Sequence, residues 1–264
     1  MATMASVIHR GIHRHVIKYL AGTVVVTLGV LGFPAPVSAR PRSLHPGDYA
    51  KLVERLQERL RELKFSPGLV NGYYGAETQA AVWAFQKSQG LVAQDKVGAE
   101  TWRALADPRQ VTPLVPEGRP QRVEIDLSRQ LLTVYRRDRP LLISHVSTGS
   151  GPYFCQYGYS SSTLTPAGDF RVAKRARHST VDPMVTMDEA LSFERDPAID
   201  FTSGLRGGLM GVGTDLAGRR PGEPLIPAPS QRPTSGCVRI PAHVAEWLFR
   251  MVVVGEPVYV RSGP

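Results

Sequence analysis

The chain has 264 residues, and its hydrophobic content of 42% and charged content of 21% are typical of folded domains and exclude wholesale disorder. That length allows two modest domains, each with a core of its own, and the formal net charge of +9 makes the whole chain basic. The 22 prolines and 25 glycines follow no period, which excludes collagen-like and low-complexity chains.

The first 39 residues have the pattern of a secretory signal. A basic segment opens it, with charges at Arg10, Arg14 and Lys18, and an uncharged apolar run covers residues 19–33. Residues 37–39 fit the small-residue cleavage rule, so we predict a signal peptide over 1–39, cleaved after Ala39. The apolar run is shorter than the about 20 residues that a membrane span needs. We therefore expect a secreted protein of the cell wall or periplasm, with membrane attachment only if the signal stays uncleaved.

Loss of residues 1–39 would remove three basic residues and no acidic one, which lowers the formal charge from +9 to +6. A basic exported protein is attracted to anionic wall polymers or lipid head groups, although charge alone also fits a solvated surface without a specific partner. The chain has no basic cluster at helical spacing, so we do not expect nucleic acid as a partner.

Residues 48–107 have the spacing of a small helical module. Apolar residues recur at helical intervals in its first part, at Leu52, Leu56, Leu60 and Leu63. Further helical patterns cover residues 77–88 and the segment around Trp102. Between them the sequence nearly repeats itself, as GLVNGYYGAET from Gly68 and GLVAQDKVGAET from Gly90. We predict three helices in which two turn-helix units share one core.

The core and turn positions of this module form an ordered set: Leu56-Gln57, Asn71-Gly72, Gly75, Thr78, Ala81-Val82, Phe85-Gln86, Gly90-Leu91, Val97-Gly98, Thr101-Trp102 and Leu105. In order and spacing this set resembles the peptidoglycan-binding domain of the three-helix type. The resemblance implies that the module binds the wall, through glycan or through stem peptide. Because the matching residues mostly hold the fold, we expect binding from exposed groups in grooves near Asn71, Tyr73 and Tyr74.

Residues 108–120 separate the helical module from the rest of the chain. Four prolines punctuate this stretch, at positions 108, 113, 116 and 120. Such spacing predicts a semi-stiff, extended linker that can hold one domain off the other.

A mostly β domain of mixed, sandwich-like type is predicted over residues 121–262. After Gln121 the apolar residues take a period of two, beginning with Val123, Ile125 and Leu127. Further strand-like runs cover residues 140–147 and 258–260. One C-terminal helix is expected to begin at Pro241, because proline suits the first position of a helix.

Three short motifs follow one another in this domain: His145-Val-Ser147-Thr-Gly149, Thr165-Pro-Ala-Gly168-Asp-Phe170 and Thr234-Ser-Gly-Cys237-Val-Arg239. In order and spacing they resemble the catalytic domain of YkuD-type L,D-transpeptidases, which carries an STG turn, a TPxGxF turn and an active-site segment ending in SHGCVR. The final GEPVYV also resembles the strand that closes that domain. The resemblance implies a mixed β domain with the cysteine on a loop at one end.

The resemblance also implies acyl transfer through Cys237, without a cofactor or a metal. A thiolate attacks a stem tetrapeptide at its L,D bond, expels D-alanine and leaves a thioester, which an acceptor amine then takes over. The backbone N–H groups of Gly236 and Cys237 would form an oxyanion hole. Arg239 would hold the loop or raise the local positive potential. The thiolate has to be generated, because only a few per cent of free cysteine is ionised at neutral pH.

The chain departs from the family pattern at two expected histidines. Ser235 stands before Gly236 where the pattern has histidine, and an alignment of residues 210–214 with the His-Gly pair places Val212 at the general base. A positioned base typically contributes roughly 10² to 10⁴ in rate, so either another group replaces it or the domain is catalytically weak or silent. Three histidines are candidates for a substitute base: His145, His178 and His243. His145 is expected to be a packing or edge residue, and His243 a solvated one.

Three functions stay open on these grounds. The first is a working cysteine transpeptidase with an unusual base, and the second is a catalytically silent wall-binding protein that keeps the fold as an interaction surface. The third is a metal-dependent wall hydrolase, which the unpaired spacing of the mature chain's histidines does not favour. Cys155 is expected to be a half-buried structural cysteine, since a disulfide to Cys237 would block the nucleophile.

Overall fold

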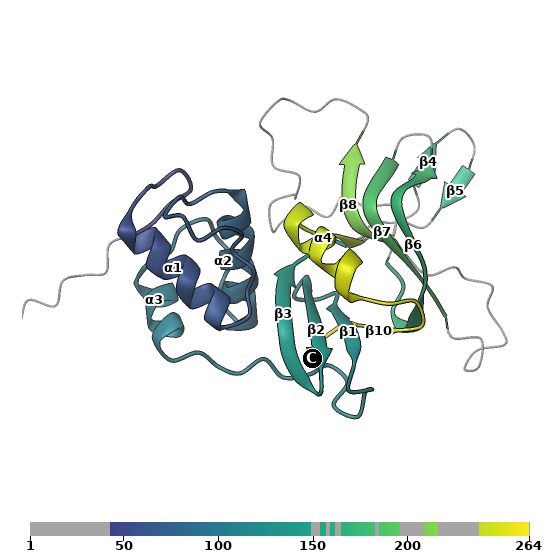
Figure 1. Cartoon of the computed structure of the whole chain (residues 1–264), viewed down its shortest axis with the longest axis horizontal. Helices are drawn as coiled ribbons and strands as arrows, with labels where there is room; N and C mark the ends of the chain where they lie inside the picture. The colour runs from purple at the N-terminus through teal and green to yellow at the C-terminus, as the bar shows by residue number, and fades with distance from the viewer. Residues whose placement is uncertain are drawn as a thin grey trace, which may run out of the picture. The chain divides into compact units, whose positions relative to one another are not determined.

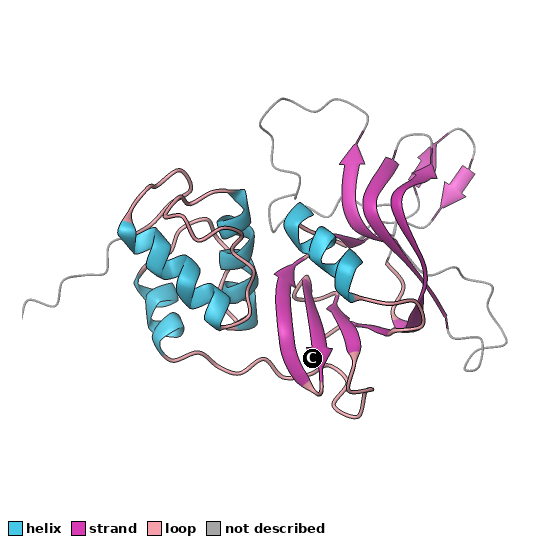
Figure 2. Cartoon of the chain, in the orientation of Figure 1, coloured by secondary structure: helices cyan, strands magenta, loops and turns pink. Residues whose placement is uncertain are grey.

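The computed structural model describes residues 43–148, 154–156, 159–161, 165–182, 185–195, 209–215 and 238–263. These residues belong to one compact unit. A helical module comes first, then a mixed sheet with one further helix (Figures 1 and 2). Among the described residues, no helix is both long enough and apolar enough to cross a membrane.

Three helices build the module, as the sequence predicts: α1 (Lys51–Glu62), α2 (Ala76–Ser88) and α3 (Ala99–Ala106). α1 is amphipathic and buries Val53, Leu56 and Leu60. α2 is buried over most of its circumference, because α1, α3 and the sheet domain all supply residues to the same core. A core that surrounds α2 explains why its sequence lacks a polar stripe.

Two buried glutamines fix the turns of the near repeat. The Gln57 amide donates to the Thr78 hydroxyl at 2.9 Å, and its carbonyl accepts the N–H groups of residues 71 and 72 at 3.0 Å. Gln86 does the same work in the second copy, where it donates to the Thr101 hydroxyl at 3.2 Å. The equivalent glycines 68 and 90 have φ of 75° and 73°, a region that glycine enters without a steric penalty. The repeated residues therefore shape turns, as the resemblance implies.

Within the described residues, eight strands form one sheet in the order β3-β2-β1-β10-β6-β7-β8-β9, and two short strands pair separately as β4-β5. The β1–β10 and β8–β9 pairs are parallel and the other pairs are antiparallel, which confirms the mixed β domain. The strands are β1 (Arg122–Asp126), β2 (Leu131–Arg136), β3 (Arg139–His145), β4 (Phe154–Gln156), β5 (Tyr159–Ser161), β6 (Gly168–Asp182), β7 (Val185–Arg195), β8 (Leu209–Asp215), β9 (Val238–Arg239) and β10 (Pro257–Arg261).

The predicted C-terminal helix is α4 (Ala242–Met251), with Pro241 at its N-cap. Its apolar face, including Val244 and Leu248, packs into a core formed by residues of β1, β2, β6, β7 and β10 (Figure 1). Each fully buried aliphatic side chain of this kind contributes about 1.5–3 kcal/mol of transfer free energy. The helix therefore covers one face of the sheet and anchors the chain directly after β9.

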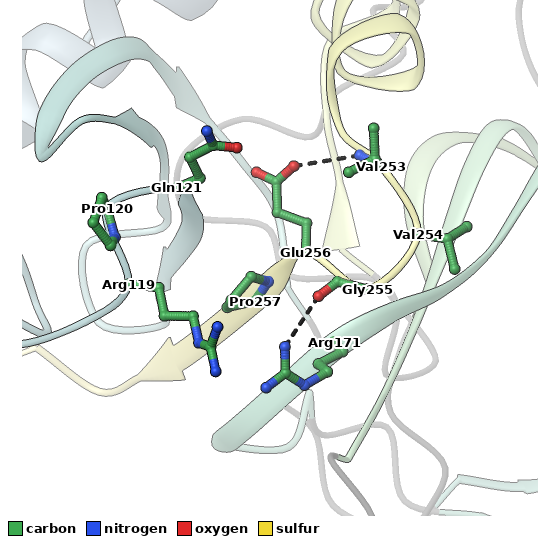
Figure 3. Close-up of a pocket in the computed structure, with 9 residues that line it drawn as sticks. All are labelled: Arg119, Pro120, Gln121, Arg171, Val253, Val254, Gly255, Glu256 and Pro257. Atoms are coloured by element: carbon green, nitrogen blue, oxygen red, sulfur yellow. Dashed lines mark hydrogen bonds between the residues drawn. The ribbon is translucent and has the colours of Figure 1, made fainter.

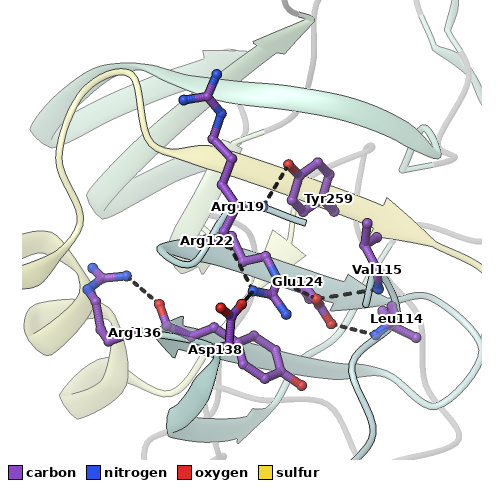
Figure 4. A network of polar contacts seen from close by, with 9 residues as sticks. Leu114, Val115, Arg119, Arg122, Glu124, Arg136, Asp138 and Tyr259 are labelled. Atoms are coloured by element: carbon purple, nitrogen blue, oxygen red, sulfur yellow. Dashed lines mark hydrogen bonds and ion pairs between the residues drawn. The ribbon is translucent and has the colours of Figure 1, made fainter. Parts of the chain in front are cut away.

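The proline-rich linker packs along the molecule, so the expectation that it holds one domain off the other is wrong. Near its start the Arg109 N–H donates to the Gln89 side chain at 2.7 Å, and further along the Leu114 N–H donates to Glu124 at 2.7 Å (Figure 4). Sheet residues Leu131 and Ile143 also lie in the core cluster of the helical module. Burial of shared apolar surface stabilises this packed arrangement, even though a proline-rich segment is stiff and extended.

Candidate functional site

The strand that directly follows the predicted nucleophile lies within the described residues. Ser235, Gly236 and Cys237 lie outside the described residues, and the description resumes at the next residue, where β9 begins. In β9, Val238 pairs with Met210 and Arg239 pairs with Gly211 of the parallel strand β8. Cys237 is therefore covalently attached to the first residue of a buried strand at this end of the sheet.

The other side of β9 is paired with the STG turn. The Ser147 N–H donates to the Arg239 carbonyl at 2.9 Å, and the Arg239 N–H donates to the Ser147 carbonyl at 2.8 Å. β3 and β9 are the two outer strands of the sheet, and Ser147 lies two residues beyond β3, so this bridge joins the two edges. Two motifs far apart in the sequence thus become neighbours at one corner of the fold.

Gln130 holds the STG turn in place, and sequence reasoning missed it. Its amide nitrogen donates to the Thr148 hydroxyl at 2.6 Å, while its side-chain oxygen accepts the Thr148 N–H at 2.7 Å. Gln130 is buried and has a φ of 54°, which is uncommon for a residue other than glycine. A polar residue in a hairpin turn carries no sequence signal for such a role, because its partner Thr148 lies 18 residues further along the chain.

Residues 120–260, more than half of the chain, match the model of the L,D-transpeptidase (YkuD) catalytic domain. The chain belongs to this family. Residues 50–105 match a peptidoglycan-binding domain family, so a wall-binding type of module precedes the L,D-transpeptidase domain.

Solved and curated proteins are similar to the chain. An L,D-transpeptidase from Xylanimonas cellulosilytica is 28% identical with a TM-score of 0.68, and the alignment covers 84% of this chain and 98% of that one. An L,D-transpeptidase from Stackebrandtia nassauensis is 18% identical with a TM-score of 0.44, over 83% and 95% of the two chains. The amidase CwlM of Mycobacterium tuberculosis is 42% identical over 57 residues, which are 22% of this chain and only 14% of that protein.

Arg239 of the L,D-transpeptidase domain is buried within β9, with only 6% of its surface exposed. Its backbone takes part in both the β8 pairing and the Ser147 bridge. A guanidinium is always charged in proteins, so this residue brings a positive charge into the interior two positions after Cys237.

Two of the three candidate bases contact the helical module. The buried His145 ring lies edge-on to Trp83 at 5.3 Å, and its Nδ1 lies 2.5 Å from the Lys87 ammonium. The prediction that His145 is a packing residue is confirmed. His243 was expected to be solvated, which is wrong: its Nε2 lies 3.1 Å from the Ser66 carbonyl and its Nδ1 lies 3.3 Å from the Glu77 carboxylate.

The backbone register places the third candidate in one row with Val212. His178 of β6 is opposite Asp188 of β7, and Asp188 is in turn opposite Val212 of β8. Neighbouring strands are about 4.8 Å apart, so the backbones at His178 and Val212 are separated by about 10 Å. Whether His178 replaces the expected general base stays a prediction. Cys155 lies in β4 opposite Ser160, and its expected structural role stays a prediction.

The predicted wall-binding residues separate into exposed and buried groups. Tyr74 is fully buried, its hydroxyl donates to the Asp95 carbonyl at 2.7 Å, and burial raises the pKa of Tyr74 above its ordinary value. The expectation that Tyr74 offers an exposed aromatic face is therefore wrong, because its ring fills the module's core. Tyr73 is 48% exposed and Asn71 is exposed, so both stay predicted contacts. The Asn71 side chain also accepts the Tyr73 N–H at 3.0 Å and so shapes this turn.

Three hollows in the described part of the molecule are lined by residues outside the three motifs. One of about 480 Å³ lies beside the loop between α4 and β10 and is lined by residues such as Arg119, Arg171 and Val253 (Figure 3). A second, of about 600 Å³, lies between the linker, the helical module and the β2–β3 hairpin. A third, of about 650 Å³, is lined by Gln121, Arg136, Arg137 and Arg139. The candidate catalytic site is therefore identified by the pairing of the strands and by the positions of the motifs, and not by a hollow.

Proposed function

We propose that the chain is an exported, peptidoglycan-binding L,D-transpeptidase that transfers acyl groups through Cys237. The observation that carries the proposal is the pairing of β9 with both β8 and Ser147, since it joins the STG turn to the strand that follows the cysteine. Strand β8 on one side of β9 and the Ser147 bridge on the other would hold the nucleophile in a fixed position, which acyl transfer requires.

In the proposed reaction the Cys237 thiolate attacks the carbonyl carbon at the L,D bond of a stem tetrapeptide. The carbonyl oxygen gains negative charge, which the N–H groups of Gly236 and Cys237 stabilise. The C–N bond then breaks, the D-alanine amine takes a proton, and a thioester remains on sulfur. The amine of a second stem attacks this thioester, loses a proton that balances the one taken up by D-alanine, forms the new amide and releases the thiolate.

Local positive charge is the proposed source of the thiolate. A neighbouring cation lowers the pKa of a thiol, and buried Arg239 is two residues from Cys237. His145 and His243 contact the helical module, and His178 lies two strands from Val212. The alternative function is a silent wall-binding protein, which the loss of both expected histidines favours.

Acylation of Cys237 tests the function. We expect the purified mature protein to gain the mass of the acyl donor when it is incubated with a disaccharide-tetrapeptide or with a carbapenem, as measured by intact-protein mass spectrometry. Cys237→Ala should abolish the adduct, and the matched variant Cys155→Ala should keep it. If no adduct forms after long incubation, the chain is the silent wall-binding protein.

The basic surface of the sheet domain supports anionic wall polymers as a further partner. Arg137 and Arg139 are exposed in the β2–β3 turn and line the same hollow as Gln121. Guanidinium groups pair well with phosphate groups, and the attraction weakens as salt screens it.

Arg137→Gln with Arg139→Gln should lower binding to phosphate-bearing walls about fivefold at low salt, since two exposed charge contacts contribute about 1 kcal/mol. Co-sedimentation with walls measures this, and the difference should vanish at high salt. Arg55→Gln with Arg61→Gln removes the same charge from exposed positions of α1 and should have a smaller effect. Equal losses in both pairs would mean that net charge alone drives binding.

A further inference from the structure

Lys87 connects the helical module to the candidate active site. Its ammonium, on the last turn of α2, lies 2.6 Å from the Gln130 carbonyl and 2.5 Å from His145 Nδ1. An ammonium group is only a donor, so a hydrogen bond between these two groups requires His145 Nδ1 as the acceptor. Trp83, one turn earlier on α2, packs edge-on against the same imidazole at an interplanar angle of 79°.

From Gln130 the contacts continue into the STG turn. The Gln130 carbonyl that accepts from Lys87 also accepts the Val146 N–H at 3.1 Å. The Gln130 side chain binds both the hydroxyl and the N–H of Thr148. Lys87 therefore contacts residue 145 directly. It also contacts Gln130, which in turn binds residues 146 and 148.

The same turn is hydrogen-bonded to β9, the strand that follows Cys237 in the sequence. Ser147, between the residues that Gln130 holds, makes both backbone hydrogen bonds to Arg239, and Arg239 follows Cys237 by two residues. Each contact along the path is buried or part-buried, where hydrogen bonds are less weakened by competing water. The Gln130 backbone also adopts a conformation that is uncommon without support from its surroundings.

We propose that Lys87 is a positioning residue for Cys237, so that the peptidoglycan-binding module is a structural part of the active site. The inference rests on the proposed function of Cys237. Without the Lys87 ammonium, the Gln130 carbonyl and His145 lose a hydrogen-bond donor that they share. The STG turn then becomes more mobile, and so does β9, which is paired with this turn. Lys87 itself touches no reacting atom in this scheme.

Lys87→Met in the full mature chain tests the proposal. We expect acylation of Cys237 by a carbapenem to slow about tenfold, the effect of one lost buried hydrogen bond on a transition state. Retention on peptidoglycan should stay unchanged, because the predicted binding residue Tyr73 lies on a different turn. Lys87→Arg should recover part of the rate, and Lys96→Met, at an exposed lysine of the same module, should leave the rate at the wild-type value.

Hydrogen exchange at the Ser147 and Thr148 amides provides a readout that does not need catalysis. In Lys87→Met these two amides should exchange faster, while the amides of β10 keep their wild-type protection. If Lys87→Met does not fold, Lys87→Gln is the alternative, because it keeps a hydrogen-bond donor. It should also slow acylation and speed exchange at these two amides, but by smaller amounts. Wild-type acylation together with unchanged exchange would overturn the positioning role. A wild-type protein that never acylates would refute the proposed function, and the exchange measurement would still decide the role of Lys87.

Discussion

Replacing Val212 and Ser235 together by histidine should raise the rate at which Cys237 is alkylated about 100-fold, within the range that a positioned general base provides. Val212 lies in β8, which is directly paired with β9, and Ser235 is separated from Cys237 only by Gly236. An imidazole with an ordinary pKa near 6.5 is mostly neutral at pH 7 and can accept the thiol proton.

The pH dependence of the alkylation rate distinguishes catalysis by the introduced base from an effect of a changed loop conformation. With histidine at both positions, the alkylation rate should rise through the imidazole pKa and reach a plateau near neutral pH. In the wild-type chain we expect the alkylation rate to follow the ionisation of the Cys237 thiol alone. Val212→Gln with Ser235→Gln is the matched control, since glutamine is of similar size but does not titrate. An unchanged rate in the histidine pair would show that the alignment misplaces the base at Val212.

Glu124→Leu should lower the free energy of unfolding by about 3–5 kcal/mol, because it leaves the buried Arg122 charge without its buried partner. Arg122 is fully buried, and its Nε lies 2.7 Å from the Glu124 carboxylate (Figure 4). Burial alone would lower the pKa of Arg122, but hydrogen bonds to Glu124 and Asp138 raise it above its ordinary value. The guanidinium therefore stays charged, and Leu114 at the linker loses its acceptor as well.

Urea unfolding of three variants measures the effect. Asp138→Asn removes an acid that is 57% exposed and should cost less than about 1 kcal/mol, since water screens that pair. Arg122→Met combined with Glu124→Leu should recover most of the loss, because neither buried charge of this pair then remains. If Glu124→Leu costs no more than Asp138→Asn, the pair does not stabilise the linker junction.

The elements that the sequence predicted are those in which the spacing of apolar residues shows which face of the element is buried. The helical spacing in α1 and the period of two in β1 both mark one buried face, and the structure confirms both elements. The near repeat from Gly68 and Gly90 predicted two similar turns, and both glycines have positive φ. The long strands β6 and β7 were not predicted over their full length, because a sequence such as RVAKRARHST has little regular alternation.

The errors concern residues whose surroundings come from distant parts of the chain. Tyr74 and Tyr73 are adjacent and alike in sequence, yet one is buried in the core and the other is half exposed. His243 looks like a solvated residue near a helix start until Glu77 and Ser66 of the helical module approach it. Neither outcome has a local signal, since exposure depends on which segment packs on top.

By itself the sequence determined the two kinds of domain, their order and the identity of Cys237 as the residue to test, because motif spacing and hydrophobic periodicity are properties of short segments. Only the tertiary structure decided that the linker packs, that Gln130 and Lys87 support the STG turn, and that this turn is bonded to β9. These contacts join residues that are distant in sequence, so they arise only once the segments that carry them have packed together.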